Sequence, residues 1–312
     1  MKRADLDRVV NDLQHEKVAV LMGGRSAERA ISLLSGDAVL RALRERGVNA
    51  IGIDVSEDRA LQLREQNVDR VFNILHGRGG EDGQLQGMLG MMGIPCTGSG
   101  VLASALTMDK ARTKQLWSCL GLPVPEGEVL DENSEWEQLI RNYGELVVKP
   151  VHEGSSIGMS MVDSAPALRK AWETAREFDS LVMAERRIKG REFTVTLLQG
   201  EVLPAIELST DREFYDYEAK YLAEDTHYIC PANLPPAQQE RLATLSRAAF
   251  DSVGCEGWGR VDLMQDEEGD FYLLEINTVP GMTDHSLVPI AAKTAGLDFG
   301  DLVLTILYGS QS

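Results

Sequence analysis

The chain has 312 residues, of which 43% are hydrophobic, and it carries a formal net charge of −18. This hydrophobic share is typical of a globular protein, and the length allows two or three domains. An excess of carboxylates repels phosphodiester backbones and anionic lipids, so we expect neither nucleic acid nor a membrane as a partner.

Nothing in the sequence indicates export. The first residues, from Met1 to Lys17, are charged throughout and lack the apolar core of a secretory signal. Apolar runs fall well short of the roughly 20 residues that span a bilayer. The 4 cysteines form no CxxC pair, which favours free thiols in a reducing compartment. We therefore expect a cytoplasmic protein.

Residues 1–100 alternate apolar runs with helical patterns. Val18–Met22 predicts a buried strand, and the stretch from Ser26 to Arg46 predicts a helix. The apolar residues at helical spacing are Ala27, Ile31, Leu34, Ala38 and Ala42. Two more strands and a helix are expected at 50–55, 71–75 and 84–92. This alternation predicts an α/β domain with a parallel sheet and helices on its faces.

Ligands of such sheets bind beyond the carboxyl ends of the strands. Two glycine-rich segments, 23–28 and 76–83, fall there. In the first, Glu28 either interacts with the helix dipole in the first turn of a helix or binds a substrate ammonium. In the second, His76 is either a polar residue near a helix or a site residue at the end of a strand.

The rest of the chain is interpreted as two α+β units, at 101–189 and 190–312. The second unit is expected to contain two hairpins, separated by a long irregular stretch at 214–231 that is rich in tyrosine and charge. Loops of that length are usually functional or disordered, and we expect this one to act as a lid.

The last hairpin carries the strongest chemical signal. Arg260 and Asp262 are two residues apart on one strand and share a face, as do Glu275 and Asn277 on its partner. Oxygen ligands that converge on one face suit Mg²⁺. The alternative is a solvated hairpin with cross-strand ion pairs. The Pro-Gly turn at 280–281 offers backbone N–H groups nearby, which favours an oxyanion site.

A second signal is Gly-Ser-Ser-Ile-Gly at 154–158. Small residues let backbone N–H groups surround an anion, and Lys149 lies just upstream, where a phosphate would supply a counter-charge. The same five residues fit the nucleophile elbow of a serine hydrolase, with Ser156, Asp262 and His285 in the hydrolase order. That elbow needs a helix directly after the serine, whereas the sequence predicts a strand, so phosphate binding is favoured.

Taken together, these motifs resemble those of D-alanine–D-alanine ligases, a family of the ATP-grasp superfamily. The resemblance runs from about residue 17 to residue 308. It rests on the segments 23–28, 76–83, 148–150, 153–158, 215–221, 259–262 and 275–283. It implies an ATP-grasp fold, in which an amino-terminal α/β domain precedes two α+β domains that clamp ATP. One departure is Arg186, where the family often has lysine.

The resemblance also implies a role for each matching residue. Catalysis is implied for Glu28, Ser155, Tyr221, Arg260, Gly281 and Ser286, and D-alanine binding for His76 and Leu287. ATP binding is implied for Lys110, Lys149, Ser156, Glu185, Glu192 and Lys220. Two Mg²⁺ or Mn²⁺ ions are assigned to Asp262, Glu275 and Asn277. In this scheme Tyr221 ties the lid to Ser155 and Glu28.

The implied activity is the joining of two D-alanine molecules through an acyl phosphate, with release of ADP and phosphate, for peptidoglycan synthesis. A relative that makes D-alanyl-D-lactate or D-alanyl-D-serine is the alternative, and Tyr221 favours the dipeptide. A nucleotide sensor without catalysis is disfavoured, since it needs no oxyanion arginine. We expect a homodimer, and the resemblance admits a monovalent cation such as K⁺.

Overall fold

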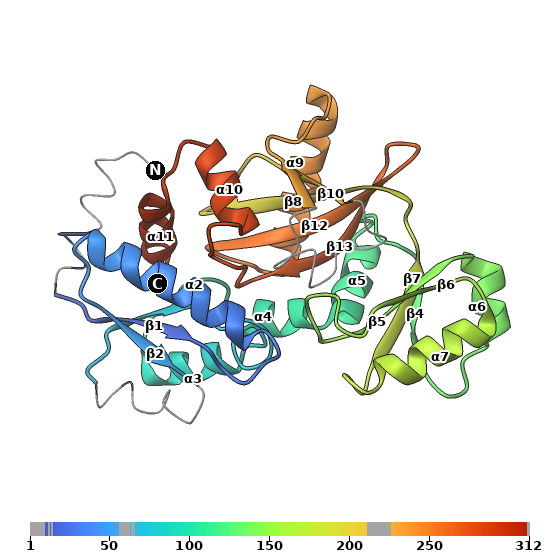
Figure 1. Cartoon of the computed structure of the whole chain (residues 1–312), viewed down its shortest axis with the longest axis horizontal. Coiled ribbons are helices and arrows are strands. Elements are labelled where there is room, and N and C mark those ends of the chain that lie inside the picture. The colour runs from blue at the N-terminus through green and yellow to red at the C-terminus, as the bar shows by residue number, and fades with distance from the viewer. Residues whose placement is uncertain are drawn as a thin grey trace.

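The computed structural model describes residues 10–11, 13, 15–55, 63, 66–210 and 226–310. Three units follow one another along the chain (Figure 1). The amino-terminal unit and the central unit lie at opposite ends, and the helices α4 (Val101–Met108) and α5 (Lys110–Cys119) run between them. Among the described residues, no helix is both long and apolar enough to span a bilayer.

The amino-terminal unit contains a parallel sheet with the strand order β2-β1-β3. Its elements are β1 (Val18–Met22), α2 (Arg29–Glu45), β2 (Ala50–Asp54), β3 (Arg70–Asn73) and α3 (Gln84–Met92). Alternate residues of β1 point to opposite faces: Val18 and Val20 pack with α2, while Ala19 and Leu21 pack with α3. The predicted sheet with helices on both faces is confirmed.

The predicted apolar face of α2 was partly wrong. Ile31 and Ala42 are buried as predicted, but Leu34 is 59% exposed, and the other buried positions are Ser32, Ser35, Gly36, Val39 and Leu43. Small residues allow the helix to approach β1 closely, because a Cβ on Gly36 would lie 2.5 Å from the Cβ of Met22. Serine and glycine carry no apolar signal, so the periodicity did not identify Ser32, Ser35 and Gly36.

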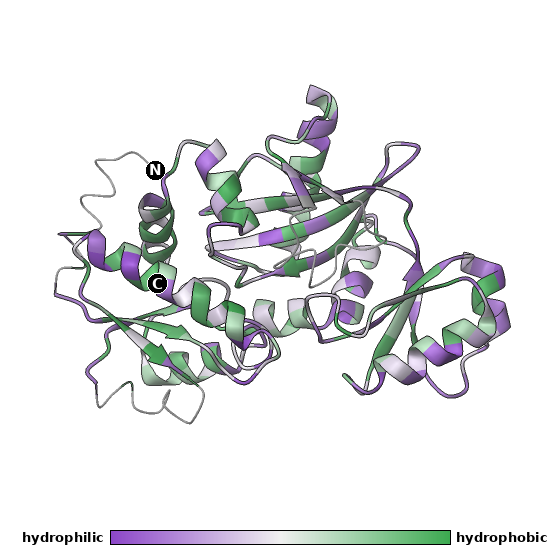
Figure 2. Ribbon diagram, viewed as in Figure 1, coloured by the Kyte–Doolittle hydropathy of each residue, from purple (hydrophilic) through white to green (hydrophobic). Residues whose placement is uncertain are grey.

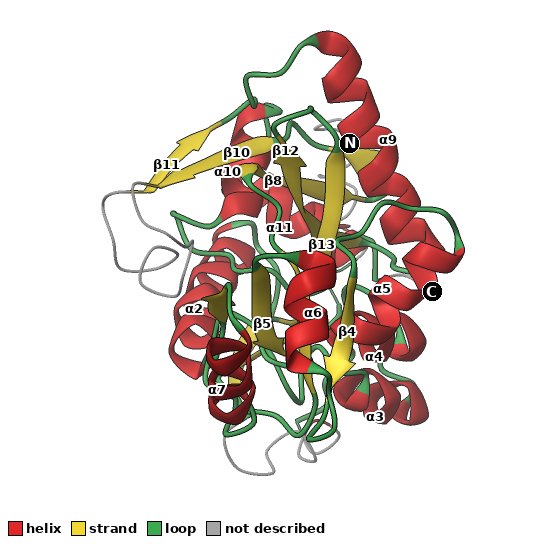
Figure 3. Cartoon of the chain, turned by 90° about the vertical axis from the view of Figure 1, so that its right-hand side faces the viewer, coloured by secondary structure: helices red, strands yellow, loops and turns green. Residues whose placement is uncertain are grey.

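The central unit has a mixed architecture around the four-stranded sheet β4-β7-β5-β6. Its elements are β4 (Gly127–Leu130), α6 (Trp136–Tyr143), β5 (Leu146–Pro150), β6 (Ser160–Val162), α7 (Ala165–Ala175) and β7 (Val182–Arg186). All its strand pairs are antiparallel. The helices α6 and α7 lie side by side over this sheet (Figure 3), and together they enclose a core of their own.

The carboxy-terminal unit contains the sheet β11-β10-β8-β12-β13, with β9 paired to β8. Its strands are β8 (Gly190–Leu198), β9 (Glu201–Val202), β10 (Ile206–Thr210), β11 (Thr226–Ile229), β12 (Trp258–Asp266) and β13 (Phe271–Asn277). Its helices are α9 (Pro236–Ser252), α10 (Leu287–Thr294) and α11 (Phe299–Tyr308). The end of the predicted irregular stretch is therefore a strand, β11, which pairs with β10.

The first and last parts of the chain share one core. The helix α11 is apolar along most of its length and lies against α2 (Figure 2). Trp258 of β12 is fully buried, and its ring centroid lies 6.3 Å from that of Phe72 in β3. Arg46, after α2, pairs with Asp298 and Asp301 at the start of α11, at 2.5 Å each. The amino-terminal sheet is thus fixed to the carboxy-terminal unit.

Replacing Trp258 with alanine tests this shared core. Because Trp258 is fully buried between two units, Trp258→Ala should lower the free energy of unfolding by about 3–5 kcal/mol. Urea unfolding followed by circular dichroism measures the change. Phe178→Ala, at a residue that is 46% exposed, is the control and should have a much smaller effect. A loss below about 1 kcal/mol for Trp258→Ala would contradict the shared core.

Candidate active site

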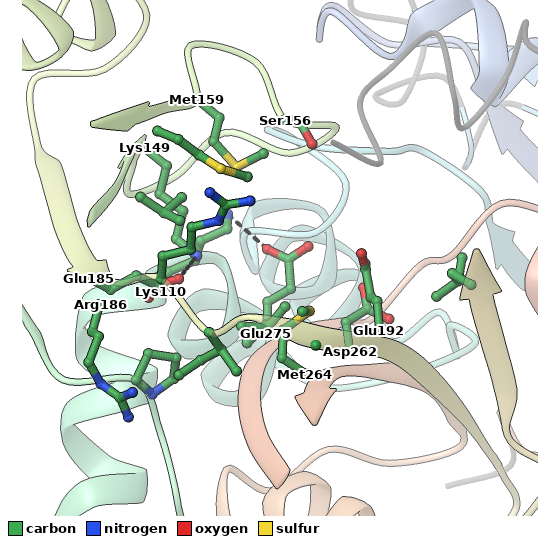
Figure 4. Close-up of a pocket in the computed structure, with 18 of the residues that line it drawn as sticks. Lys110, Lys149, Ser156, Met159, Glu185, Arg186, Glu192, Asp262, Met264 and Glu275 are labelled. Carbon is green, nitrogen blue, oxygen red and sulfur yellow. Dashed lines mark hydrogen bonds and ion pairs between the residues drawn. The ribbon is translucent and has the colours of Figure 1, made fainter. Parts of the chain in front are cut away.

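Two adjoining cavities lie where the three units meet. The larger, of about 610 Å³, lies between the central sheet and the carboxy-terminal sheet (Figure 4). The smaller, of about 190 Å³, lies between the amino-terminal unit and the turn after β13. Ser155 and Glu275 line both cavities. A large and a small ligand could therefore react where the cavities meet.

The described residues assigned to the site by resemblance fall into these two cavities. The larger is lined by Lys110, Lys149, Ser155, Ser156, Glu185, Glu192, Asp262 and Glu275. The smaller is lined by Glu28, His76, Ser155, Arg260, Glu275, Asn277, Gly281, Ser286 and Leu287. Lys220 and Tyr221 lie outside the described residues, as does most of the predicted lid.

The register of the last hairpin brings its polar residues together as predicted. Arg260 lies opposite Asn277, and Asp262 lies opposite Glu275. The Asp262 carboxylate accepts hydrogen bonds from Arg260 Nε at 2.8 Å and Asn277 Nδ2 at 3.0 Å. Thr194 of β8 donates a further bond of 2.7 Å. The predicted shared face is confirmed, because the antiparallel pairing aligns the two strands.

This face offers an oxygen-rich donor set. Asp262 and Glu275 line the larger cavity, and the side chain of Asn277 lies beside them. The described residues contain no cluster of three or more histidine, cysteine or acidic ligands. Two carboxylates and one amide fit Mg²⁺, which keeps several waters and takes phosphate oxygens as its remaining ligands.

Lys110 and Lys149 line the larger cavity, and a third lysine, Lys114, pairs with Glu185, which also lines it. Glu185 is buried, its Oε1 accepts from Lys149 Nζ at 2.6 Å, and its Oε2 forms an ion pair with Lys114 Nζ at 2.6 Å. Lys110 Nζ donates to the Glu153 carbonyl at 2.7 Å and lies 3.5 Å from Glu275. Around Glu185 two ammonium groups face one carboxylate, so the group carries surplus positive charge that suits an anionic ligand.

Lys114 was not singled out from the sequence. Burial lowers its pKa to about 8, although Glu185 opposes this shift. Burial raises the pKa of Glu185, but Lys114 and Lys149 outweigh it and hold that pKa below its usual range. A lysine inside a helix carries no local signal of this contact, which only the packing of α5 on β7 creates.

The loop between β5 and β6 joins the two cavities. Ser155 and Ser156 have φ angles of +53° and +59°, a left-handed backbone that costs about 1–3 kcal/mol for such residues. Ser155 Oγ donates to Glu28 Oε1 at 2.5 Å, which links this loop to the amino-terminal unit. A strand, β6, follows the loop instead of a helix, and Ser156 and His285 line different cavities. The hydrolase alternative is therefore excluded.

The smaller cavity combines groups of both charges. Glu28 and Glu81 line it together with Arg260. Glu81 is a residue whose role the sequence did not indicate, although it lies in the motif at 76–83. Its carboxylate accepts from the backbone N–H groups of Gly77 at 2.6 Å and Val279 at 3.1 Å. Burial and the nearby Glu28 raise the pKa of Glu81 to about 8.

His76 is buried at the wall of the smaller cavity. Its Nδ1 lies 2.7 Å from the Val279 carbonyl oxygen, which can only accept, so Nδ1 carries the proton. Burial lowers the pKa of His76, which keeps the imidazole neutral at neutral pH. His76 therefore acts here as a neutral hydrogen-bond donor.

The start of α10 completes the smaller cavity. Ser286 precedes the first residue of the helix, Leu287, and its Oγ accepts from Thr283 N–H at 2.9 Å. A Cβ on Gly281 would lie 2.9 Å from this oxygen, so only glycine fits without a shift. Backbone N–H groups at a helix start suit a carboxylate, and the cavity can thus accommodate a small zwitterion.

Comparison with known proteins agrees with this geometry. The family model described as D-ala D-ala ligase C-terminus matches residues 116–308, and the one described as D-ala D-ala ligase N-terminus matches residues 58–99. The chain belongs to the D-alanine–D-alanine ligase family. The D-alanine–D-alanine ligase of Pseudomonas putida is 56% identical over 93% of this chain and 92% of that protein. That of Stutzerimonas stutzeri is 57% identical over 93% of each chain.

Solved structures of the ligase family share the fold. The D-alanine–D-alanine ligase of Bacillus anthracis gives a TM-score of 0.85 at 34% identity and covers 95% of this chain and 97% of that one. The same enzyme complexed with ATP gives 0.83 at 32% identity, with the same coverage. The VanG D-Ala:D-Ser ligase of Enterococcus faecalis gives 0.80 at 30% identity, covering 95% and 99%. The predicted ATP-grasp fold is confirmed.

The raised pKa of Glu81 predicts a change in stability with pH. The folded chain holds the Glu81 proton up to a pKa of about 8, whereas the unfolded chain releases it near 4.5. The folded state therefore binds the extra proton between these values, and stability falls as the pH rises through them. Glu81→Gln removes this term, so the variant should gain stability relative to the unchanged protein from about pH 5 to about pH 8.

Urea unfolding of both proteins at the two pH values measures that difference. Glu268→Gln, at an exposed residue in the β12–β13 turn, is the control and should show no such trend. A stability difference for Glu81→Gln that stays constant with pH would show that the Glu81 carboxyl titrates normally.

Proposed function

We propose that this chain joins two D-alanine molecules into D-alanyl-D-alanine, with conversion of ATP to ADP and phosphate, and so supplies peptidoglycan precursors. One observation carries the proposal: a cavity with phosphate-binding character meets a small zwitterion-sized cavity at Ser155 and Glu275. The names of the most similar relatives support the same activity.

ATP is assigned to the larger cavity. Lys110 and Lys149 bind its phosphates, and the loop at Ser155 and Ser156 closes over them. When ATP enters, Lys149 turns from Glu185 to phosphate, while Lys114 stays with the carboxylate. Glu185 then accepts from the adenine amino group and Glu192 contacts the ribose. Lys220 reaches the γ-phosphate from the lid.

The metal assignment follows the oxygen donors of the hairpin. Asp262, Glu275 and Asn277 would hold two Mg²⁺ or Mn²⁺ ions, which when bound would neutralise the phosphates and stabilise the charge that develops during transfer. Two hydrogen bonds to Asp262 fix the position of the Arg260 guanidinium beside this site. The family resemblance also admits a monovalent cation such as K⁺.

The two D-alanine molecules are assigned to the smaller cavity. Glu28 holds the ammonium group of the first, with His76 nearby, and its carboxylate points toward the γ-phosphate. Ser286 and the N–H of Leu287 bind the carboxylate of the second. Tyr221 is assigned the role of tying the lid to Ser155 and Glu28.

The reaction follows from these positions. A carboxylate oxygen of the first D-alanine attacks the γ-phosphorus, and the lysines screen the repulsion between the anions. The free amine of the second D-alanine attacks the acyl phosphate, and Arg260 and the Gly281 N–H bind the oxyanion. Phosphate leaves with the carboxylate oxygen. The closed lid excludes water, which would otherwise hydrolyse the acyl phosphate.

A ligase that makes D-alanyl-D-serine is the second candidate, because the VanG D-Ala:D-Ser ligase shares this fold at 30% identity. Relatives named D-alanine–D-alanine ligase are more similar, at 56–57% identity, and support the dipeptide. We further propose a homodimer in the cytoplasm, with domains at 1–100, 101–189 and 190–312.

Labelled D-alanine tests the proposed reaction. With ATP and D-alanine carrying heavy oxygen in its carboxylate, we expect dipeptide, unlabelled ADP and labelled phosphate, because the bridging oxygen leaves with phosphorus. Mass spectrometry of the products measures the label. L-alanine should give no product, and D-lactate and D-serine should react poorly. Label in AMP, or efficient turnover of L-alanine, would contradict the proposal.

The hairpin carboxylates are tested by Glu275→Ala. Glu275 lines both cavities, so its loss should reduce turnover at least about a thousandfold at saturating Mg²⁺, because the metal loses one of its few protein ligands. The circular dichroism spectrum should stay unchanged. Glu268→Ala, on the exposed turn of the same hairpin, is the control and should keep full activity. Near-normal turnover by Glu275→Ala would remove the metal assignment.

A further inference from the structure

The turn between β13 and α10 is held by three polar contacts from the amino-terminal unit. The Val279 N–H donates to Glu81 Oε1 at 3.1 Å, and the Val279 carbonyl accepts from His76 Nδ1 at 2.7 Å. The Met282 N–H donates to Ser35 Oγ at 3.1 Å. The backbone of the turn is thus fixed on both sides of residues 280 and 281.

The three holding side chains also brace one another. Ser35, in α2, is fully buried, and its Oγ lies 3.5 Å from His76 Nε2. The second carboxylate oxygen of Glu81 accepts from Gly77 N–H at 2.6 Å, which fixes the loop that follows His76. We call Ser35, His76 and Glu81 the turn clamp. All three belong to the amino-terminal unit, whereas the turn belongs to the carboxy-terminal unit.

The clamp leaves one backbone donor at the centre of the turn. Pro280 has no N–H, and in the described part of the chain the Gly281 N–H has no hydrogen-bond acceptor. Gly281 lines the smaller cavity. A partly buried N–H without an acceptor is unfavourable unless a ligand supplies one.

Attachment of the two units does not depend on this clamp. The helices α10 and α11 share a large apolar core with α2 and β1, and Arg46 adds two ion pairs to Asp298 and Asp301. Polar contacts add little to such a core, because their net contribution is about 1 kcal/mol each. Their geometry, however, restricts where the peptide between Val279 and Met282 can lie.

We propose that Ser35, His76 and Glu81 are positioning residues that aim the Gly281 N–H at the oxyanion of the tetrahedral intermediate. This inference rests on the proposed function, and it gives His76 a role through the turn in addition to its place at the substrate cavity. Oxyanion donors act only in the correct place, and a shift of about 1 Å can reduce a rate a hundredfold. Glu81 and Ser35 therefore affect catalysis without touching the reacting atoms.

Two variants each release one side of the turn. Ser35→Ala removes the acceptor for Met282 N–H, and Glu81→Gln replaces one of the two carboxylate acceptors with a donor. Ser246→Ala is the matched control, because Ser246 is also a fully buried helical serine, and among the described residues its Oγ bonds only to the Leu242 carbonyl within α9.

The measurements separate positioning from folding. We expect each clamp variant to lower kcat about tenfold to a hundredfold, while the KM for ATP stays within about twofold. Calorimetry should show that the affinity of each clamp variant for a phosphinate analogue of the dipeptide also falls about tenfold to a hundredfold, because the tetrahedral phosphorus of the analogue carries the oxyanion. Affinity for D-alanine itself should be retained, and Ser246→Ala should match the unchanged protein in every measurement.

Two results would overturn the inference. One is an unchanged kcat and phosphinate affinity in a clamp variant whose melting temperature has fallen, since the clamp would then only stabilise the fold. The other is an equal loss of affinity for ATP, D-alanine and the phosphinate, which would indicate general disruption of the site. Failure of the unchanged protein to turn over D-alanine would instead contradict the proposed function.

Discussion

The antiparallel pairing of β12 with β13 sets the geometry of the whole site. Its register puts Arg260 opposite Asn277 and Asp262 opposite Glu275, and shifts directly after Asp262. A slip of one residue would turn all four side chains to the other face of the sheet. The same register fixes where β13 ends and thus where the turn to α10 begins. Thr194 of the neighbouring strand β8 donates a hydrogen bond to Asp262, so residues of three strands fix the position of the Asp262 carboxylate.

Charge in the two cavities is arranged in different ways. At the larger cavity, the Glu185 carboxylate pairs with both Lys149 and Lys114, so an anion that draws Lys149 away leaves Lys114 as the counter-ion of Glu185. In the smaller cavity, Glu28 opposes the ionisation of Glu81, and Arg260 is already paired with Asp262. An ammonium group is therefore attracted from one side, and a negative charge that forms during the reaction meets a guanidinium whose position is already fixed.

Features of the fold and the site could be predicted where they depend on residues close together in the sequence, and could not where they depend on residues far apart. The hairpin face followed from the period-two rule, and the parallel sheet followed from alternating apolar runs, since both patterns are local in the sequence. Lys114, Glu81 and Ser35 gave no such signal, because their partners are Glu185, Val279 and Met282, far away along the chain. The helical pattern predicted that Leu34 is buried, but Leu34 is exposed and lines the smaller cavity, where an apolar side chain can contact a ligand instead of the core.

The core shared by α2 and α11 has a consequence for how the protein is made. During synthesis the amino-terminal sheet leaves the ribosome first, but Val39 and Leu43 of α2 have no complete partner surface until α11 has emerged. Part of the apolar face of the first unit therefore stays exposed to water until α11 has been made. A chain truncated before α11 would still contain the residues that line the cavities, but it would lose the packing that brings those residues together.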